Sequence, residues 1–270
     1  MSFINASLIP LNYITIGFSA IIALSFGSFL NMVIYRLPLM IAGCSAVASQ
    51  KINLLKPSQC THCHYKLNIL DNIPVLSYVM LKGRCRNCKI NLSIRYPSVE
   101  IISTIICVYT LAVYGITIVT IALCLLWLSL IALAFIDFKH LLLPDTITIP
   151  LILIGLTLNL FNGLTSFGNS VAGALLGYLF LFAIAVSFGL IIKKKTMGKG
   201  DFKLFAAIGA WFGFASLPVI LLLSSFCSII IYFLLSNDQK NKYIPYGTAI
   251  AIATFTYWIF QKPINNFIFY

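Results

Sequence analysis

The stretch "TIVTIALCLLWLSLIALAFI" (residues 117–136) carries no charged side chain. A helix of this length spans the hydrocarbon core of a bilayer, which is about 30 Å thick. Comparable apolar runs recur near residues 13–35, 99–115, 147–162, 168–192, 202–215, 217–235 and 246–260. We therefore predict an all-α polytopic integral membrane protein with about eight transmembrane helices.

The composition of the whole chain agrees with this prediction. Of its 270 residues 60% are hydrophobic and 9% are charged, whereas soluble domains carry roughly 25% charged residues. The polar residues from Arg36 onward follow the first apolar run, and no basic segment precedes that run. We therefore expect a retained first span rather than a cleaved signal peptide.

The positive charges indicate the orientation of the chain. With eight spans, all of the 18 Lys and Arg residues except Lys262 fall on one face of the membrane. By the positive-inside rule this face is cytoplasmic. The net charge of +12 is thus interpreted as a topology signal with some attraction to anionic membrane lipid. No nucleic-acid-binding pattern accompanies it, so we expect no nucleic-acid partner.

The chain divides into three predicted parts. Residues 1–35 form the first transmembrane span, residues 36–98 form a small cytoplasmic insert, and residues 99–270 form the remaining membrane domain. The insert holds half of all Lys and Arg residues. It also contains two CxxC pairs separated by 21 residues, formed by Cys60, Cys63, Cys85 and Cys88.

Two CxxC pairs at this spacing are typical of a tetrahedral zinc site. The alternative is two disulfides, which need an oxidising compartment and so disagree with a cytoplasmic insert. Four thiolates leave no open coordination position, so the zinc is expected to be structural. His62 and His64 are then interpreted as bystanders, and Cys44, Cys107, Cys124 and Cys227 as small apolar residues.

The chain has six acidic residues: Asp71, Glu100, Asp137, Asp145, Asp201 and Asp238. Asp71 and Asp238 lie in polar loops and are expected to be solvated. Asp145 follows a proline and precedes an apolar run, which is typical of a helix N-cap. Asp201 also begins an apolar run, so a capping role is considered there too.

Asp137 and Asp201 are predicted to lie at the same membrane depth. Asp137 ends an outward-to-inward helix, and Asp201 begins an inward-to-outward helix, so both reach the cytoplasmic edge. Two carboxylates in a partly dry site do not both ionise easily, and such a pair shares a proton. The ionised member can take a proton from water while the protonated member binds a substrate carbonyl, which is aspartic-protease chemistry. Gly198 and Gly200 flank Asp201 closely and would allow a peptide backbone to approach.

Taken together, several motifs resemble those of the type IV prepilin peptidases of the GxGD aspartic-protease group. They are "GSFLNMVIYRLP" (27–38), the paired CxxC motifs, "RYPSVE" (95–100), "DFKHLLLPD" (137–145), "MGKGDFK" (197–203) and "IPYG" (244–247). The resemblance covers nearly the whole chain. In one place it departs from the usual pattern: the last motif usually reads like "PFGPFL", and here it reads "PYGTAI" (245–250).

The resemblance implies that Asp137 and Asp201 are the catalytic aspartates. It implies cleavage of prepilin and pseudopilin precursors after a glycine, at the cytoplasmic face of the bacterial inner membrane. It also implies methylation of the new amino terminus with S-adenosylmethionine. The CxxC-bearing insert is similar to that of the long, bifunctional form of the family.

The residue pattern gives weaker evidence for methyl transfer. Candidates are Gly27, Asn31, Arg36 and Glu100, but Gly27 could serve helix packing and Arg36 could anchor the interface. Glu100 could pair with Arg95 or hold the donor cation. Other functions considered are a transporter with a structural zinc module, a non-catalytic assembly scaffold, and a monofunctional intramembrane aspartyl protease.

Overall fold

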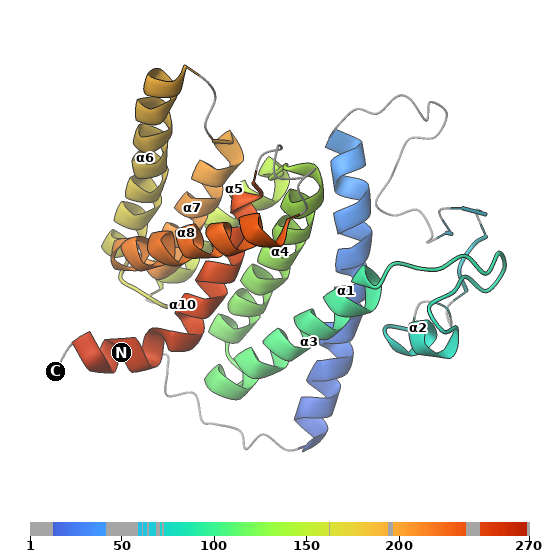
Figure 1. The fold of residues 1–270 in the computed structure, drawn as a ribbon. Helices are drawn as coiled ribbons and strands as arrows, with labels where there is room; N and C mark the ends of the chain where they lie inside the picture. The colour runs from blue at the N-terminus through green and yellow to red at the C-terminus, as the bar shows by residue number, and fades with distance from the viewer. Residues whose placement is uncertain are drawn as a thin grey trace. The chain divides into compact units, whose positions relative to one another are not determined.

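The computed structural model describes residues 13–41, 59–60, 62–63, 65–68, 71, 73–161, 163–193, 197–235 and 244–268. Cys44, His64 and Asp238 lie outside these residues. The described part is almost entirely helical (Figure 1), and its β-structure is limited to two isolated bridges in the insert. The helices are α1 (Tyr13–Ile41), α2 (Leu76–Met80), α3 (Arg95–Tyr114), α4 (Ile118–His140), α5 (Asp145–Leu160), α6 (Phe167–Ile192), α7 (Lys199–Phe212), η3 (Phe214–Ser216), α8 (Leu217–Leu234) and α10 (Tyr246–Ile268).

Each of the eight predicted apolar runs contains a helix, so the all-α membrane fold is confirmed. The count of eight spans is not confirmed. Five described segments are long and apolar enough to cross a membrane: α1, α3, α4, α6 and the segment Phe214–Leu234. In contrast, α5 has 16 residues and α7 has 14, which correspond to roughly 24 Å and 21 Å at 1.5 Å per residue.

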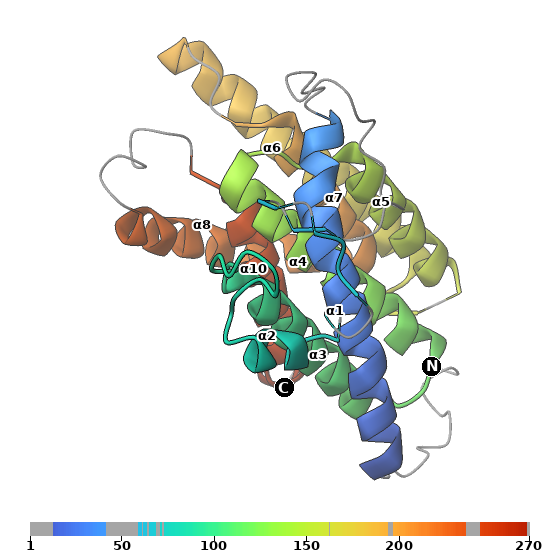
Figure 2. The same ribbon diagram turned by 90° about the vertical axis from the view of Figure 1, so that its right-hand side faces the viewer.

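The chain forms two compact units, Ile4–Ala132 and a second unit that includes Leu133–Tyr270. In the first unit α1 packs across α3 (Figure 2). A Cβ at Gly27 would collide with the Ser103 hydroxyl and the Glu100 backbone, so this crossing requires glycine. Both helices extend into the predicted 36–98 insert, because α1 continues to Ile41 and α3 already begins at Arg95.

In the second unit α7 is enclosed by α5 and α6. Gly173 of α6 and Gly209 of α7 face each other, and a Cβ on either would overlap the backbone of the opposite glycine. All residues from Asp201 to Phe212 except Lys203 are buried. The short helix α7 is therefore held as an internal element, which places Asp201 at its N-terminal end within a packed core.

A buried amide holds the opposite end of α7. Asn159 of α5 is fully buried, and its Nδ2 donates to the carbonyls of Ala210 (2.8 Å) and Trp211 (3.0 Å). Its Oδ1 accepts from the backbone N–H groups of Leu164 (2.9 Å) and Thr165 (3.0 Å). One side chain thus supplies hydrogen-bond partners to two carbonyls at the C-terminal end of α7 and to two N–H groups in the turn that follows α5.

Candidate active site

Asp137 lies one turn before the end of α4 and its exposed fraction is 5%. Its Oδ2 accepts a hydrogen bond from the Thr248 backbone N–H at 2.9 Å and lies 3.3 Å from the Thr248 hydroxyl. Thr248 belongs to the first turn of α10, where backbone N–H groups have no partner within the helix. The carboxylate of Asp137 therefore binds the N-terminus of α10, which carries a partial positive charge.

Asp201 lies in the first turn of α7 and is 8% exposed. Its Oδ2 accepts the Gly198 backbone N–H at 3.2 Å, and its own N–H donates to the Gly198 carbonyl at 3.2 Å. Gly198 is the N-cap residue of α7, and Asp201, the third helical residue, contributes to the cap through its hydrogen bond from the Gly198 N–H. Its neighbour Gly200 packs against Leu143, which also lies beside Gly247 and Asp137.

The first residues of α10 and one residue of the α4–α5 connection lie beside both aspartates. The hydroxyl of Tyr246 lies 2.9 Å from that of Ser224. Two residues later, Thr248 binds Asp137. Leu143 contacts the Cβ positions of both Gly200 and Gly247, and the latter position is 3.0 Å from Asp137 Oδ2. Two buried carboxylates, a helix N-terminus and an apolar side chain thus form one compact site.

The two glycines before Asp201 have different surroundings. A Cβ at Gly200 would lie 2.7 Å from the Leu143 Cβ, so Leu143 occupies the space beside this glycine. Gly198 is exposed, and among the described residues the contact within 4 Å of its Cβ position is the Asp201 carboxylate, at 3.2 Å. Close packing with Leu143 explains why residue 200 is a glycine. The exposed Gly198 leaves its backbone accessible on one side.

Asp145 does not act as the predicted N-cap. The N-cap of α5 is Pro144, and Asp145 is the first helical residue, with no side-chain cap hydrogen bond. Both carboxylate oxygens of Asp145 instead lie 2.7 Å from Lys203 Nζ. The prediction was wrong because the partner lies on α7, 58 residues away in the chain.

The four predicted cysteines form one cluster. Their sulfur atoms all lie within 4.8 Å of one another, with Cys60–Cys88 at 3.9 Å and Cys63–Cys85 at 4.0 Å. Tetrahedral Zn–S bonds of about 2.3 Å require sulfur atoms about 3.8 Å apart, so the cluster fits a metal. All four thiols are free, which disfavours the disulfide alternative.

The surroundings of the cluster also suit a metal site. A hydrogen bond from the Tyr65 backbone lowers the pKa of the Cys63 thiol to about 6, whereas burial and the neighbouring thiols raise the pKa of Cys88 to about 11. The lowered pKa favours a thiolate at Cys63, the form that binds metal. His62 is exposed and does not belong to the group of ligand atoms. Four sulfur ligands leave no position for water, and the site is therefore suited to a structural ion.

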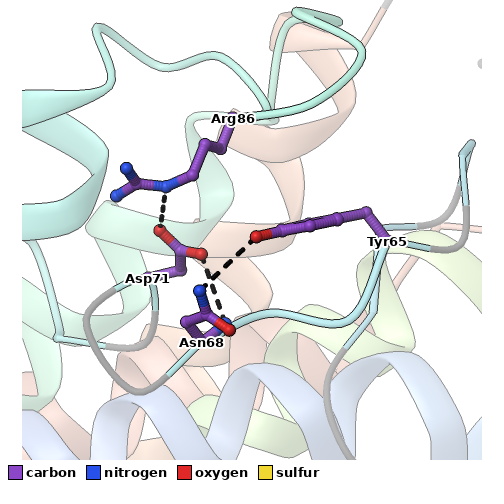
Figure 3. A network of polar contacts seen from close by, with 4 residues as sticks. All are labelled: Tyr65, Asn68, Asp71 and Arg86. Carbon is purple, nitrogen blue, oxygen red and sulfur yellow. Dashed lines mark hydrogen bonds and ion pairs between the residues drawn. The ribbon is translucent and has the colours of Figure 1, made fainter.

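An ion pair forms between Asp71, which follows the first CxxC pair, and Arg86, which lies inside the second pair (Figure 3). Arg86, inside the second pair, places Nε 2.8 Å from Oδ1 of Asp71, whose side chain is 1% exposed. Oδ2 of Asp71 accepts the backbone N–H of Asn68 at 3.2 Å, and the Asn68 amide lies 3.5 Å from the Tyr65 hydroxyl. The expectation that Asp71 is solvated was wrong, because Arg86 compensates its charge across the cluster.

The methyl-transfer candidates all lie on α1 and α3. Asn31 is 4% exposed and its Nδ2 donates to the Tyr96 carbonyl at 3.0 Å, while its Oδ1 has no hydrogen-bond partner in the described part of the chain. Glu100 is 7% exposed, and its Oε2 accepts the Val75 N–H at 2.7 Å. Among the described residues Glu100 forms no ion pair with Arg95. Arg36 is half-buried on α1.

This combination of a helical membrane fold, a buried aspartate pair and a four-cysteine insert defines a class of membrane aspartic peptidases. Residues 21–114 match the family model of the bacterial Peptidase A24 N-terminal domain, and residues 121–234 match that of the Type IV leader peptidase family. The chain belongs to the Type IV leader peptidase family.

Curated relatives carry the name prepilin leader peptidase/N-methyltransferase. The relative from Aeromonas hydrophila is 40% identical over 91% of this chain and 90% of its own length. Those from Pseudomonas putida and Neisseria gonorrhoeae are 38% and 36% identical, covering 90% and 87% of this chain and 89% and 87% of their own lengths. No solved structure matches the chain.

Sequence reasoning missed three residues of the site, namely Leu143, Tyr246 and Thr248. Tyr246 and Thr248 belong to the last motif, and Thr248 stands where the usual pattern has a proline. The relevant signal was that this departure introduces a hydroxyl and a backbone N–H next to a glycine. The sequence does not show that these groups reach Asp137.

Proposed function

We propose that this chain is a bifunctional prepilin leader peptidase and N-methyltransferase. It cleaves the leader from type IV prepilins and pseudopilins and then methylates the new amino terminus. The observation that supports the peptidase assignment is that Asp137 and Asp201 are both at least nine-tenths buried and that Leu143 packs against Gly200, next to Asp201, and against Gly247, next to Asp137. The names of the relatives support the same pair of activities.

The aspartate pair can hydrolyse a peptide bond by acid–base catalysis. The ionised carboxylate removes a proton from a water molecule, whose oxygen attacks the scissile carbonyl carbon. The protonated carboxylate donates its proton to the developing oxyanion. The carboxylate that took the water proton then passes it to the scissile nitrogen, the other carboxylate takes back a hydroxyl proton, and the C–N bond breaks to release the amine of the mature pilin. The leader leaves with a new carboxylate, and the pair returns to its shared-proton state.

The expected substrate has a basic leader followed by an apolar helix. Such a precursor would place its leader in the cytoplasm and its helix in lipid, with the scissile bond at the interface. The charge distribution supports a cytoplasmic location for Asp137 and Asp201. The exposed backbone at Gly198 offers a place where an extended peptide can lie beside Asp201.

The test is to co-express a prepilin with Asp137→Ala or Asp201→Ala and to measure precursor processing. We expect unprocessed precursor with either variant. The matched control is Asp145→Ala, because Asp145 is half-exposed and contacts Lys203 rather than the pair, and this variant should process normally. Full processing by Asp137→Ala would remove that residue from the catalytic assignment.

For methyl transfer we propose that Asn31 and Glu100 contribute to the site of the donor, with Arg36 nearby on α1. S-adenosylmethionine is a cation that supplies an electrophilic methyl group. The buried carboxylate of Glu100 can compensate its charge, and Asn31 Oδ1 is a buried acceptor lacking a partner among the described residues. Gly27 serves the crossing of α1 and α3 rather than the ligand, because its Cβ position is filled.

Mass spectrometry of the pilin amino terminus separates the two activities. We expect Asn31→Ala and Glu100→Gln to yield cleaved pilin with reduced methylation. Asp137→Ala should yield uncleaved precursor. Cleaved and fully methylated pilin from both Asn31→Ala and Glu100→Gln would place the donor elsewhere.

We also propose that the four cysteines bind zinc and that the ion stabilises the insert. The insert is a small segment, and metal binding adds directly to folding stability in segments with little apolar core. The ion would lie between two tight turns joined by the Asp71–Arg86 pair.

A further inference from the structure

This chain departs from the usual motif at residues 246 and 248–250, and Thr248 is the residue of these that binds Asp137. The pattern "PFGPFL" places a proline at the position that Thr248 occupies in "PYGTAI". Proline has neither a backbone N–H nor a side-chain donor. Thr248 has both, and both lie within hydrogen-bonding distance of Asp137 Oδ2, at 2.9 Å from the nitrogen and 3.3 Å from the hydroxyl.

The hydroxyl of Thr248 has a second possible acceptor. Its Oγ1 lies 2.9 Å from the carbonyl oxygen of Ala134, which is one turn before Asp137 on α4. A hydroxyl has one proton, so it is shared between this carbonyl and the carboxylate. Both acceptors belong to the same turn of α4, and the hydroxyl therefore holds the first turn of α10 in register with Asp137.

We propose that Thr248 is a positioning residue for the catalytic carboxylate of Asp137. It reserves Oδ2 as a hydrogen-bond acceptor and leaves Oδ1 to exchange a proton with water. Because Oδ2 accepts the Thr248 N–H, it cannot carry a proton that points toward the Thr248 nitrogen. The shared proton of the pair is thus confined to Asp137 Oδ1 or to Asp201.

The other half of the pair has an equivalent arrangement. Oδ2 of Asp201 accepts the backbone N–H of Gly198 at the start of α7. Each aspartate therefore has one oxygen held by a helix N-terminus, Asp137 by α10 and Asp201 by α7. Such fixed donors orient a catalytic group without reorganisation during the reaction.

This inference rests on the proposed peptidase activity, and kinetic constants of the full chain with a purified prepilin test it. Thr248→Val keeps the shape and the backbone N–H but removes the hydroxyl. We expect kcat to fall about fivefold to tenfold, as for one hydrogen bond to a charged group that is partly shared, with KM unchanged. Thr248→Ser restores the hydroxyl and should return kcat to within about twofold of wild type.

Thr248→Pro removes both donors, and its kcat should fall further than that of Thr248→Val, because the shorter hydrogen bond is lost as well. Folded enzyme is quantified in each preparation by thermal unfolding and size exclusion, so that kcat refers to folded protein. An unchanged kcat for Thr248→Val, or a failure of Thr248→Ser to restore it, would overturn the inference. Equal kcat values for Thr248→Pro and wild type would also overturn it.

Asp137→Asn distinguishes this inference from the proposed function. If Asp137→Asn abolishes cleavage while Thr248→Val is fully active, the peptidase assignment stands and the role of Thr248 is wrong. If Asp137→Asn cleaves normally, the peptidase assignment itself fails.

Discussion

Replacing Asn159 with leucine should destabilise the second unit of the protein substantially. Leucine has the same branched shape as asparagine and is larger, so the change removes hydrogen bonds without opening a cavity. Asn159 is fully buried. It makes four hydrogen bonds, two to carbonyls at the C-terminal end of α7 and two to N–H groups in the turn after α5.

The expected cost follows from counting the backbone groups that lose their partner. The Ala210 carbonyl keeps a hydrogen bond from the Ser170 hydroxyl. The Trp211 carbonyl and the N–H groups of Leu164 and Thr165 lose the bonds that Asn159 provides. An unmade buried hydrogen bond costs about 1–3 kcal/mol, and the two N–H groups are only partly buried, so about 3 kcal/mol is expected in total.

The assay is thermal unfolding of the full chain in nanodiscs. A loss of about 3 kcal/mol corresponds to a decrease in Tm of roughly 6–12 °C for a domain of this size. The matched control is Thr157→Val on the same helix, because Thr157 is exposed and its hydroxyl bonds only carbonyls of its own helix. The reasoning is refuted if Asn159→Leu unfolds at the wild-type temperature, or if Thr157→Val lowers Tm equally.

Three further predictions concern the two sites and the α6–α7 contact. Asp137→Asn and Asp201→Asn keep an oxygen that can accept the Thr248 and Gly198 N–H groups, so the fold should persist while cleavage falls by about 10²–10⁴-fold. A rate within tenfold of wild type in a quantitative processing assay would contradict this. Cys88→Ser should lower the zinc content measured by elemental analysis and destabilise the insert without altering the aspartate pair, whereas wild-type protein without zinc would contradict the proposed metal. Gly209→Val should lower Tm in nanodiscs because its Cβ meets the α6 backbone, and an unchanged Tm would refute that contact.

Much of the fold was predictable because its signals are local in the chain. Runs of apolar residues predicted helices at the right places, since a helix in lipid must satisfy its own backbone groups. The number of spans was less predictable, because length decides whether a helix crosses the bilayer. Gly213 ends α7 with a φ of 80°. The helix has 14 residues, which is too short to cross, and all residues from Asp201 to Phe212 except Lys203 are buried inside the protein.

The acidic residues show why individual roles were harder to predict. Asp145 and Asp71 were interpreted from their neighbours in the sequence as a cap and a solvated residue. Each instead forms an ion pair, with Lys203 and Arg86 respectively. A carboxylate next to a proline or in a polar loop carries no local sign of a cation that folding brings to it.

The sequence by itself determined the membrane class of the protein, its family, the four-cysteine cluster and the choice of Asp137 and Asp201 as the candidate pair. These follow from composition, spacing and charge, which are properties of the chain. The tertiary structure alone decided what touches the pair: Thr248 reaches Asp137 across 111 residues, and Leu143 fills the space beside Gly200. Contacts between distant segments depend on how helices pack, and hydrogen bonds between such segments leave no periodic pattern in the sequence.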